Sequence, residues 1–432
     1  MRWWWLICCS AHGHVFEKYC GHEVHWAEPP VTDYELLLVQ VPNAAGRVNE
    51  VVHRHGARNL WAPLGCWAPA PKAAPAAPEL QCRLPFGVSA GHGRHRLTKR
   101  YLTPGHCGFG SLLGEAEVQF RNLAGSLNAS YGQVPWWKTL DVRDASVRLY
   151  SCDNERNLGS LDLLMAKLFP SNYEASVDTL PPEEDPFQLP GFFGVSPCDG
   201  SPLPALQEIE DDKDFRAFAE RWLRRANVTW NHMLYDCILT ARCAGASLPP
   251  AIEEVADEAL LWGYRQQLAA VYGSNWTTWA VQPALHAIAL EMQTAAQVEV
   301  PRLAVWSTHD STMIYLLKAL QAWDGVWPGY ASAVVLELYR GPEGPLVRLL
   351  RDGRPVTMGA CEVLCPLARF LRVVADAAAP CTFQAAPIEG ASGHKATTAT
   401  MAAYLLAAFT LGLSITAGWA RRRPGTLQQQ LL

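Results

Sequence analysis

The segment Leu303-Ala-Val-Trp-Ser-Thr-His-Asp310 decides the fold class of this chain of 432 residues. Its first four residues form an apolar run typical of a buried strand, and a polar loop with His309 and Asp310 follows. Apolar side chains then recur at helical spacing, at Met313, Leu316, Leu317 and Leu320. A strand that passes through a short loop into a helix is the unit of α/β folds, so we expect a sheet covered by helices.

The same order of elements occurs earlier in the chain. Ser146-Val-Arg-Leu-Tyr150 predicts a strand, Ser151-Cys-Asp-Asn-Glu-Arg156 a loop, and the leucines between Leu161 and Leu168 a helix. Ligands of open α/β sheets bind at the carboxyl ends of strands, where helix N-termini favour anions. We therefore expect Arg156 to lie on the same edge of the sheet as His309.

A third segment, Arg54-His-Gly-Ala-Arg58, places one imidazole between two guanidiniums. Arginine offers planar bidentate donors that match the oxygens of a phosphoryl group. The imidazole of His55 is then placed to attack phosphorus. The pair His309-Asp310 supplies a further phosphate donor and a proton for the departing alcohol. These two segments predict phosphoryl-transfer chemistry.

The chain ahead of His55 is irregular. Glu35-Leu-Leu-Leu-Val-Gln-Val41 predicts a buried strand, but the polar, turn-forming residues 42–50 separate it from Val51-Val-His53. We interpret residues 42–50 as an insertion or as the result of a misplaced exon boundary. The Ala/Pro-rich residues 62–79 predict a surface loop.

Two further regions have clear patterns. Residues 211–226 place Phe215, Phe218 and Trp222 on one helical face, which predicts a separate helical layer. Residues 333–339 and 346–350, joined by a Gly/Pro-rich turn, predict a β-hairpin.

Composition excludes several classes of protein. The net charge of -5 is spread without long blocks of one sign, which argues against a nucleic-acid partner. The 13 cysteines lack the spaced Cys-x-x-Cys pairs of a zinc module, and no metal-ligand cluster is evident, so we expect no metal or cofactor. Three Asn-x-Ser/Thr sequons, at Asn128, Asn227 and Asn275, predict glycosylation.

The C-terminal region predicts a membrane anchor. Residues 396–420 carry no charge, and residues 399–420 are long enough to cross a bilayer, which takes about 20 residues. Three arginines at 421–423 follow, which favours a single-pass type I protein with residues 421–432 in the cytosol. A buried core helix is the alternative. The N-terminal segment, residues 1–34, contains only a weak or truncated signal peptide.

The motifs together resemble those of the histidine acid phosphatases. Within that family the chain is similar to the membrane-anchored animal-type branch, the lysosomal, prostatic and testicular acid phosphatases and the phosphoxylose phosphatases. The likeness covers residues 35 to about 382 and includes Gln119–Gly125, Pro328–Ser332 and Cys361–Phe370. It implies a phosphoglycerate-mutase-like α/β core sheet with flanking helices and a smaller, mostly helical cap at about residues 170–260. A stalk at 383–398 would lead to the anchor.

The resemblance also assigns roles by position. It makes His55 the nucleophile that forms a phosphohistidine and Asp310 the proton donor to the leaving group. The phosphoryl oxygens would be bound by Arg54, Arg58, Arg156 and His309. Taken alone, Arg156 also fits a structural ion pair, and Asp310 fits a helix N-cap.

The cysteines of this family imply disulfides. The resemblance pairs Cys361 with Cys365 and, over a long range, Cys198 with Cys381. Ala333 stands where the family has a cysteine that pairs with a partner near Cys237 or Cys243, so we expect those two to bond to each other.

The leading hypothesis is an acid phosphatase for small phosphomonoesters, in the lysosome, another endomembrane compartment or at the cell surface, with its catalytic domain lumenal or extracellular. Two alternatives stay open. One is a dedicated phosphatase for a phosphorylated sugar of a glycan, such as 2-phosphoxylose, or for an inositol phosphate. The other is a weakly active or inactive membrane glycoprotein that keeps the fold for binding. A homodimer is compatible with each.

Overall fold

The computed structural model describes residues 19–20, 46–59, 66, 82–84, 93–98, 103–105, 110–143, 146–169, 174–179, 185–187, 203–231, 233–272, 278, 280–297 and 300–377. Residues Met1–Phe383 form one compact unit and Gln384–Leu432 a second, and every described residue belongs to the first. Within the described ranges, no helix has the length and apolar character that a membrane crossing requires. The predicted anchor, the stalk, the cytosolic tail, Glu35–Val41, Asn275, Cys198 and Cys381 lie outside them.

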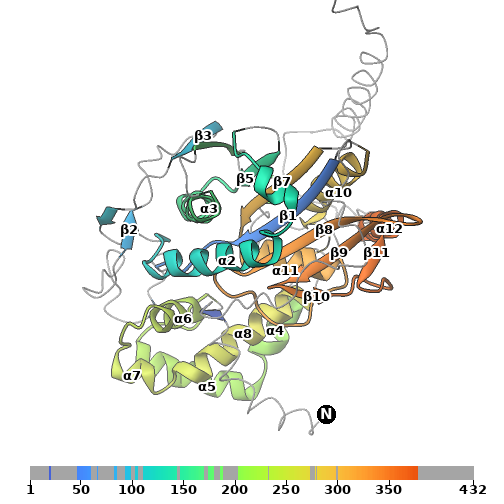
Figure 1. Ribbon diagram of the computed structural model, residues 1–432. Coiled ribbons are helices and arrows are strands. Elements are labelled where there is room, and N and C mark those ends of the chain that lie inside the picture. Colours follow the sequence, from blue (N-terminus) through green and yellow to red (C-terminus); the bar gives the residue numbers. More distant parts are fainter. Residues whose placement is uncertain are drawn as a thin grey trace, which may run out of the picture. The chain divides into compact units, whose positions relative to one another are not determined.

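The centre of the fold is one sheet, in which nine of the described strands pair (Figure 1). Three neighbouring parallel strands form its middle: β1 (Gly46–Arg54), β7 (Val300–Thr308) and β5 (Val147–Ser151). Beside β1 the sheet continues antiparallel through β8 (Ala333–Gly341), β9 (Gly344–Arg351) and β10 (Arg354–Val356), while β11 (Leu364–Pro366) also pairs with β9. Beside β5 lie β6 (Glu174–Thr179) and β3 (Gly93–Thr98). β2 (Cys82–Leu84) and β4 (Thr103–Gly105) pair separately.

Helices cover both faces of the sheet because alternate strand residues point to opposite sides. Val51 and Val305 pack in one apolar cluster with α2 (Glu115–Tyr131) and α3 (Glu155–Leu168). Val52 and Trp306 belong to a second cluster with α10 (Gln282–Gln297), α11 (Asp310–Ala319) and α12 (Leu367–Ala377). A short 3-10 helix, η1 (Pro135–Thr139), follows α2.

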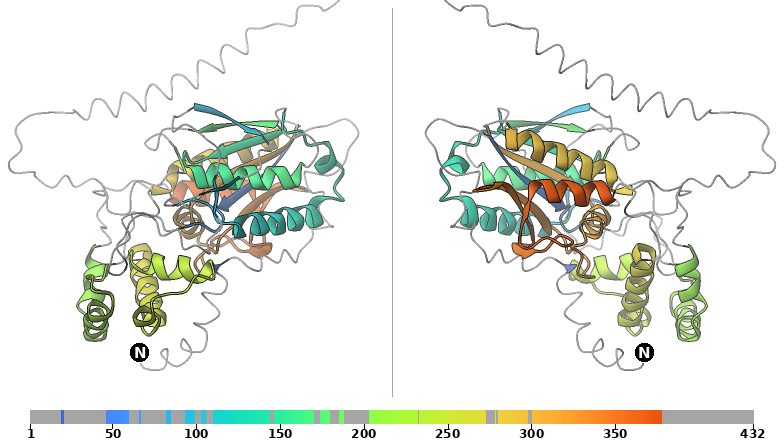
Figure 2. Two further views of the ribbon diagram at one scale, coloured as in Figure 1. Left: turned by 90° about the vertical axis from the view of Figure 1, so that its left-hand side faces the viewer. Right: turned by 90° about the vertical axis from the view of Figure 1, so that its right-hand side faces the viewer.

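A group of helices, here called the helical layer, lies at one end of this three-layered core (Figures 1 and 2). It consists of α4 (Leu203–Glu210), α5 (Lys213–Ala226), α6 (Tyr235–Cys243), α7 (Pro250–Glu253) and α8 (Ala256–Tyr272). Buried aromatic rings of Phe218, Trp222 and Trp230 pack edge to face or tilted against one another inside it. The helix predicted at 211–226 is confirmed, with Asp212 as its N-cap. Strand β6, inside the range predicted for the cap, pairs in the sheet instead.

The prediction for the segment ahead of His55 is wrong in one respect. Residues Gly46 to Glu50, which we assigned to an insertion, are the first half of β1. Their backbone pairs with β7 from Gly46 opposite Val300 onward, and with β8 from Asn49 opposite Glu337 onward. Strand pairing on both sides supplies backbone hydrogen bonds whatever the side chains, so a polar sequence can occupy a central strand. The strand therefore runs without interruption into the motif.

The disulfides confirm one expectation and correct another. Cys361 and Cys365 are bonded, as the resemblance implies. Cys237 and Cys243 do not bond to each other; Cys237 pairs with Cys66 and Cys243 with Cys20. Both lie on α6 six residues apart, and the helix rises about 9 Å over that length, which is beyond the reach of a disulfide.

Candidate active site

The predicted site residues follow the carboxyl ends of neighbouring parallel strands. Arg54 at the end of β1 pairs with Thr308 at the end of β7, and Ser151 of β5 pairs with Ser307. The loops that leave these three strand ends therefore begin at one edge of the sheet, as we expected for Arg156 and His309. The ring centroids of His55 and His309 lie 5.6 Å apart.

His55 is held by its backbone and by its own ring. Its amide donates to the Thr308 carbonyl at 3.1 Å, and its Nδ1 lies 2.9 Å from the Gly56 carbonyl oxygen. A carbonyl only accepts, so Nδ1 carries the proton and Nε2 keeps its lone pair. Burial, followed by the charges of Arg156 and Arg54, lowers the pKa of His55 well below 6.5. The ring is therefore neutral even in mild acid, and Nε2 has the lone pair that a nucleophile needs.

Gly56 allows helix α2 to approach the motif. A Cβ atom at this position would lie 2.6 Å from the Cβ of Ala116, which is closer than side chains pack. The Gly56 amide donates to Ser160 Oγ at 3.0 Å, and the Ala57 amide to Gln119 Oε1 at 2.8 Å. The loop after β1 is thereby fixed between α2 and α3.

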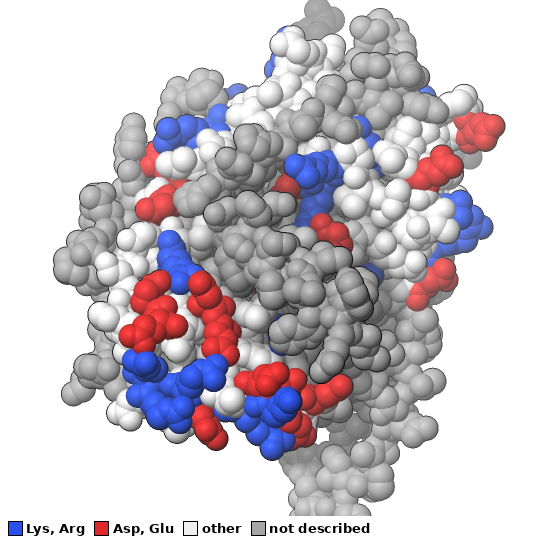
Figure 3. Space-filling model, turned by 90° about the horizontal axis from the view of Figure 1, so that it is seen from below, with Lys and Arg blue, Asp and Glu red and all other residues white. Residues whose placement is uncertain are grey.

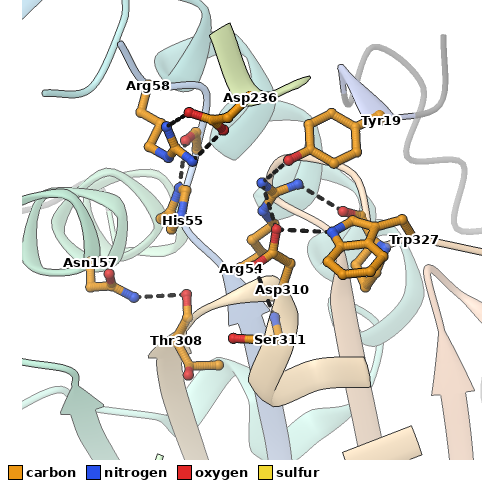
Figure 4. A network of polar contacts seen from close by, with 12 residues as sticks. Tyr19, Arg54, His55, Arg58, Asn157, Asp236, Thr308, Asp310, Ser311 and Trp327 are labelled. Carbon is orange, nitrogen blue, oxygen red and sulfur yellow. Dashed lines mark hydrogen bonds and ion pairs between the residues drawn. The ribbon is translucent and has the colours of Figure 1, made fainter. Parts of the chain in front are cut away.

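Arg54 is fully buried between two aromatic rings. Its guanidinium carbon lies 4.4 Å from the ring centroid of Tyr19 and 4.3 Å from that of Tyr330. It donates to the Pro328 carbonyl at 2.8 Å and to the Tyr19 hydroxyl at 2.5 Å, and it pairs with Asp310 at 2.9 Å (Figure 4). Burial lowers the pKa of Arg54, but Asp310, Tyr19 and Tyr330 together raise it by more, so the charge is retained.

Arg58 forms a two-point ion pair with Asp236 of α6 (Figure 4). Its Nη2 lies 2.8 Å from Asp236 Oδ1 and its Nη1 lies 3.2 Å from Oδ2. Burial lowers the pKa of Arg58, but the Asp236 carboxylate, Tyr330 and Tyr19 together raise it on balance. The helical layer thus contributes the Asp236 carboxylate to the site.

Arg156, in the first turn of α3, differs from the other two arginines. Within the described residues no ion pair holds its guanidinium, which lies near Gly110, where an added Cβ would come 3.2 Å from Nη1. Burial and then the charge of Arg58 lower its pKa to about 10. A buried cation without a carboxylate favours the arrival of an anion.

One feature is common to all three guanidiniums. The Nε atoms of Arg54, Arg58 and Arg156 are buried and have no hydrogen-bond partner among the described residues. Buried donors are paired in the large majority of cases, and exceptions often occur where a ligand binds. A phosphoryl group, with several acceptor oxygens, matches this set of donors.

His309 and Asp310 stand at the start of α11. Nε2 of His309 lies 3.3 Å from the side-chain nitrogen Nδ2 of Asn154, and Asn154 is the N-cap of α3. Asn154 therefore links the two loops. Burial and the charge of Arg156 lower the pKa of His309 to about 3, so this ring is also neutral.

The Asp310 carboxylate is surrounded by donors (Figure 4). Its Oδ1 accepts from the Ser311 amide at 2.8 Å, and its Oδ2 accepts from Trp327 Nε1 at 3.0 Å and from Arg54. Burial raises the pKa of Asp310, but Arg54 and Trp327 together lower it on balance. Its side chain is 21% exposed, so it is open to a substrate.

The sequence analysis missed several residues that complete the site. Tyr330 lies inside Pro328–Ser332, which resembles the family but received no role, and Asn154 stands inside the loop at residues 151–156. The sequence around Asp236 and Tyr19 contains no motif that indicates a place in the site. Asp236 is positioned by helix α6, and Tyr19 by the disulfide of its neighbour Cys20. Among the described residues, no group of three or more His, Cys, Asp or Glu side chains has the geometry of a metal site.

Sequence comparison finds curated relatives. Lysosomal acid phosphatase of Rattus norvegicus is 26% identical over 317 residues, which cover 62% of this chain and 70% of the rat protein. Prostatic acid phosphatase of the same species is 28% identical over 205 residues, 45% of this chain and 50% of that protein. No family model matches the chain.

Solved structures share the fold. A multiple inositol polyphosphate phosphatase of Bifidobacterium longum, in complex with inositol hexasulfate, superposes with a TM-score of 0.53 over 83% of this chain and 98% of its own, at 11% identity. A phytase of Hafnia alvei, in complex with myo-inositol hexakis sulphate, has a TM-score of 0.51 over 79% and 99%, at 11% identity. The expected mixed α/β architecture around a central sheet is thereby confirmed. The chain is thus similar in sequence to lysosomal and prostatic acid phosphatases and shares its fold with phytases, which supports a relation to the histidine acid phosphatase family.

Proposed function

We propose that this protein is an acid phosphatase that hydrolyses phosphate monoesters through a phosphohistidine intermediate. The observation that carries the proposal is the neutral His55, whose surroundings include three buried guanidiniums with unpartnered Nε donors within the described residues. Phosphoryl transfer depends mainly on positioning and on neutralising the charge of the equatorial oxygens. Arg54, Arg58 and Arg156 supply that charge.

The reaction has two balanced steps. Nε2 of His55 attacks phosphorus, a P–N bond forms, the P–O bond to the alcohol breaks, and Asp310 gives its proton to the leaving oxygen. Water then attacks phosphorus, Asp310 takes the proton back, and the P–N bond breaks to release phosphate. His309 contributes a further donor to the phosphoryl oxygens.

The lowered pKa of His55 is suited to activity at acidic pH. A histidine nucleophile must be neutral, and the lowered pKa of His55 keeps it so at a pH where an ordinary histidine is protonated. Asp310 must carry a proton to act as the acid, and a bound phosphate dianion opposes its ionisation. We expect activity to fall as the pH rises toward neutrality.

The nucleophile is tested by His55→Ala, which removes the attacking nitrogen. We expect no measurable release of phosphate from phenyl phosphate, and no acid-labile phosphate on the protein after a rapid quench. His286→Ala, an exposed histidine of α10, serves as the matched control and keeps full activity. Full activity of the His55→Ala protein would end the proposal.

We also propose a place in the secretory pathway or the lysosome, with residues 399–420 as a single-pass anchor and the catalytic domain on the lumenal or extracellular side. The named lysosomal relative and three disulfides within the described residues support this, because structural disulfides persist in oxidising compartments. Asn128 and Asn227 are exposed, as glycosylation would need. Release of the protein from membranes by detergent but not by salt or alkaline carbonate tests the anchor.

A further inference from the structure

Among the described residues of the site, Asp236 alone carries a charge that opposes phosphate binding and has no role in the proposed reaction. It is 4% exposed and lies on α6, in the helical layer. Both of its oxygens accept from Arg58, at 2.8 and 3.2 Å. It therefore takes up two donors that would otherwise be offered to the substrate.

The position of Asp236 is fixed by covalent bonds on both sides. Its neighbour Cys237 is bonded to Cys66, which follows the histidine motif in the chain. At the other end of α6, Cys243 is bonded to Cys20, next to the Tyr19 that contacts Arg54. The carboxylate is thus a built part of the site and not the end of a mobile surface side chain.

The described charged groups of the site leave a small positive excess. Three guanidiniums, of Arg54, Arg58 and Arg156, stand against the carboxylates of Asp310 and Asp236. His55 and His309 are neutral, since burial and the nearby arginines lower their pKa values. One positive charge is left over in the free site, and two once Asp310 has taken up its proton, which suits one phosphate group but not a cluster of them.

We propose that Asp236 determines substrate specificity, by making the site select compounds with one phosphate group over compounds with several. The inference rests on the proposed phosphatase function and names its substrate class. Each further phosphate on a substrate adds about one negative charge in acid and about 1.5 to 2 at neutral pH, which the Asp236 carboxylate repels in a partly desolvated site. The transferred phosphoryl group itself still meets Arg156, Arg54 and the remaining donor of Arg58.

The direct test is Asp236→Asn, with the ratio of kcat/KM for inositol hexakisphosphate to kcat/KM for phenyl phosphate as the readout. We expect this ratio to rise about tenfold, because one repulsive charge near the bound substrate is removed. Asp236→Glu restores the charge and is expected to bring the ratio back toward that of the wild type. If Asp236 only positions the Arg58 side chain, Asp236→Asn would lower kcat/KM for both substrates and leave the ratio unchanged.

A matched control comes from the outer surface of the same layer. Figure 3 shows acidic and basic side chains side by side on the face seen from below, and the ion pairs of the layer include Arg221 with Glu258. Glu258→Gln removes the same charge from an ion pair that is more than one third exposed on both sides. Because exposed charges are screened, we expect it to leave the ratio unchanged.

A second pair of variants covers the case in which Asp236→Asn does not fold. Arg58→Gln with Asp236→Asn replaces both partners, so no buried charge is left unpaired. Compared with Arg58→Gln alone, the double variant is expected to bind pyrophosphate about tenfold more tightly, measured as competitive inhibition or by calorimetry. Equal pyrophosphate affinity in the two proteins would contradict the inference.

The outcomes separate this inference from the proposed function. A wild-type protein that hydrolyses neither substrate overturns the phosphatase proposal itself. A wild-type protein that hydrolyses phenyl phosphate, with an unchanged ratio in Asp236→Asn, overturns only the role of Asp236.

Discussion

At the scale of single residues, the unusual feature of the site is that Asp310, which we propose as the proton donor, has a lowered pKa. Burial alone raises the pKa of Asp310, but the Arg54 guanidinium and the Trp327 indole stabilise its ionised form. The group can act as an acid only after a substrate dianion has arrived. Charge on the substrate therefore brings about the protonation that the leaving group needs.

This role predicts a dependence on the leaving group. In Asp310→Asn the amide occupies the same place but has no acidic proton to give. We expect kcat for alkyl phosphates such as glycerol phosphate to fall by about 10² to 10⁴. The rate for nitrophenyl phosphate is expected to fall much less, because nitrophenolate leaves without protonation. Equal losses for both substrates would show that Asp310 only orients Arg54.

The positions of site residues could be predicted from the sequence where the residues stand in contiguous motifs. His55, Arg54 and the pair at 309–310 lie directly after strand ends, and parallel strand pairing brings them together. Asp236 and Tyr19 could not be predicted in the same way. The residues next to them in sequence do not indicate their partners. Asp236 is 178 residues from Arg58, and Tyr19 is 35 residues from Arg54.

At the scale of elements, strand β1 and helix α6 carry most of the site. The first half of β1 was predicted as an insertion because Gly46 to Glu50 are mostly polar or turn-forming. Their extended conformation is instead determined by pairing with the two neighbouring strands. Helix α6 was not predicted as part of the site. It brings Asp236 to Arg58, and its two disulfides connect it to the segments on each side of the motif.

The connection between α6 and Tyr19 can be tested with Cys243→Ser, which frees Cys20. Residues 19 and 20 lie within the range we predicted for a signal peptide, yet Tyr19 packs against Arg54, and its carbonyl accepts a hydrogen bond from the Tyr330 amide at 2.9 Å. Without the bond, we expect the unfolding free energy to fall by about 2 to 4 kcal/mol and kcat/KM to fall about tenfold. Thermal unfolding and steady-state kinetics measure both.

The matched control is the double change Cys361→Ser with Cys365→Ser. This disulfide closes a loop of four residues beside β9, away from the described histidine motifs in the sheet order. A short loop contributes little to the entropy of the unfolded chain, so we expect a small change in stability and unchanged kcat/KM. Loss of activity in the control equal to that of Cys243→Ser would refute a special role for the Tyr19 segment.

At the scale of the whole molecule, the α/β sheet with its covering helices could be predicted from the repeated strand, loop and helix units. Their periodicity is local, and both units appear as β5 with α3 and β7 with α11. The hairpin of β8 and β9 is likewise confirmed. The contact between the helical layer and the sheet edge could not be predicted, because it depends on side chains that meet only in the folded chain.

The folded molecule also contains buried histidines, which tie its stability to pH. His53 is fully buried, its ring packs edge to face on Phe120 at 5.2 Å, and burial lowers its pKa from 6.5 to about 4. The unfolded chain binds a proton below pH 6.5 and the folded chain does not until about pH 4. The stability is therefore complete above pH 6.5 and is lost as the pH falls, by about 3 kcal/mol for this residue alone.

His53→Asn tests this coupling, since the shorter amide can still donate to the Arg54 carbonyl, which lies 3.1 Å from Nδ1 of His53. The variant has no titrating group at this position, so between about pH 7 and about pH 4.5 it should lose about 2 kcal/mol less unfolding free energy than the wild type. Urea unfolding at the two pH values measures the difference. His286→Asn, an exposed histidine, is the control and should lose as much as the wild type. Parallel losses in all three proteins would mean that His53 is already protonated in the folded state, and that the acid sensitivity comes from other groups.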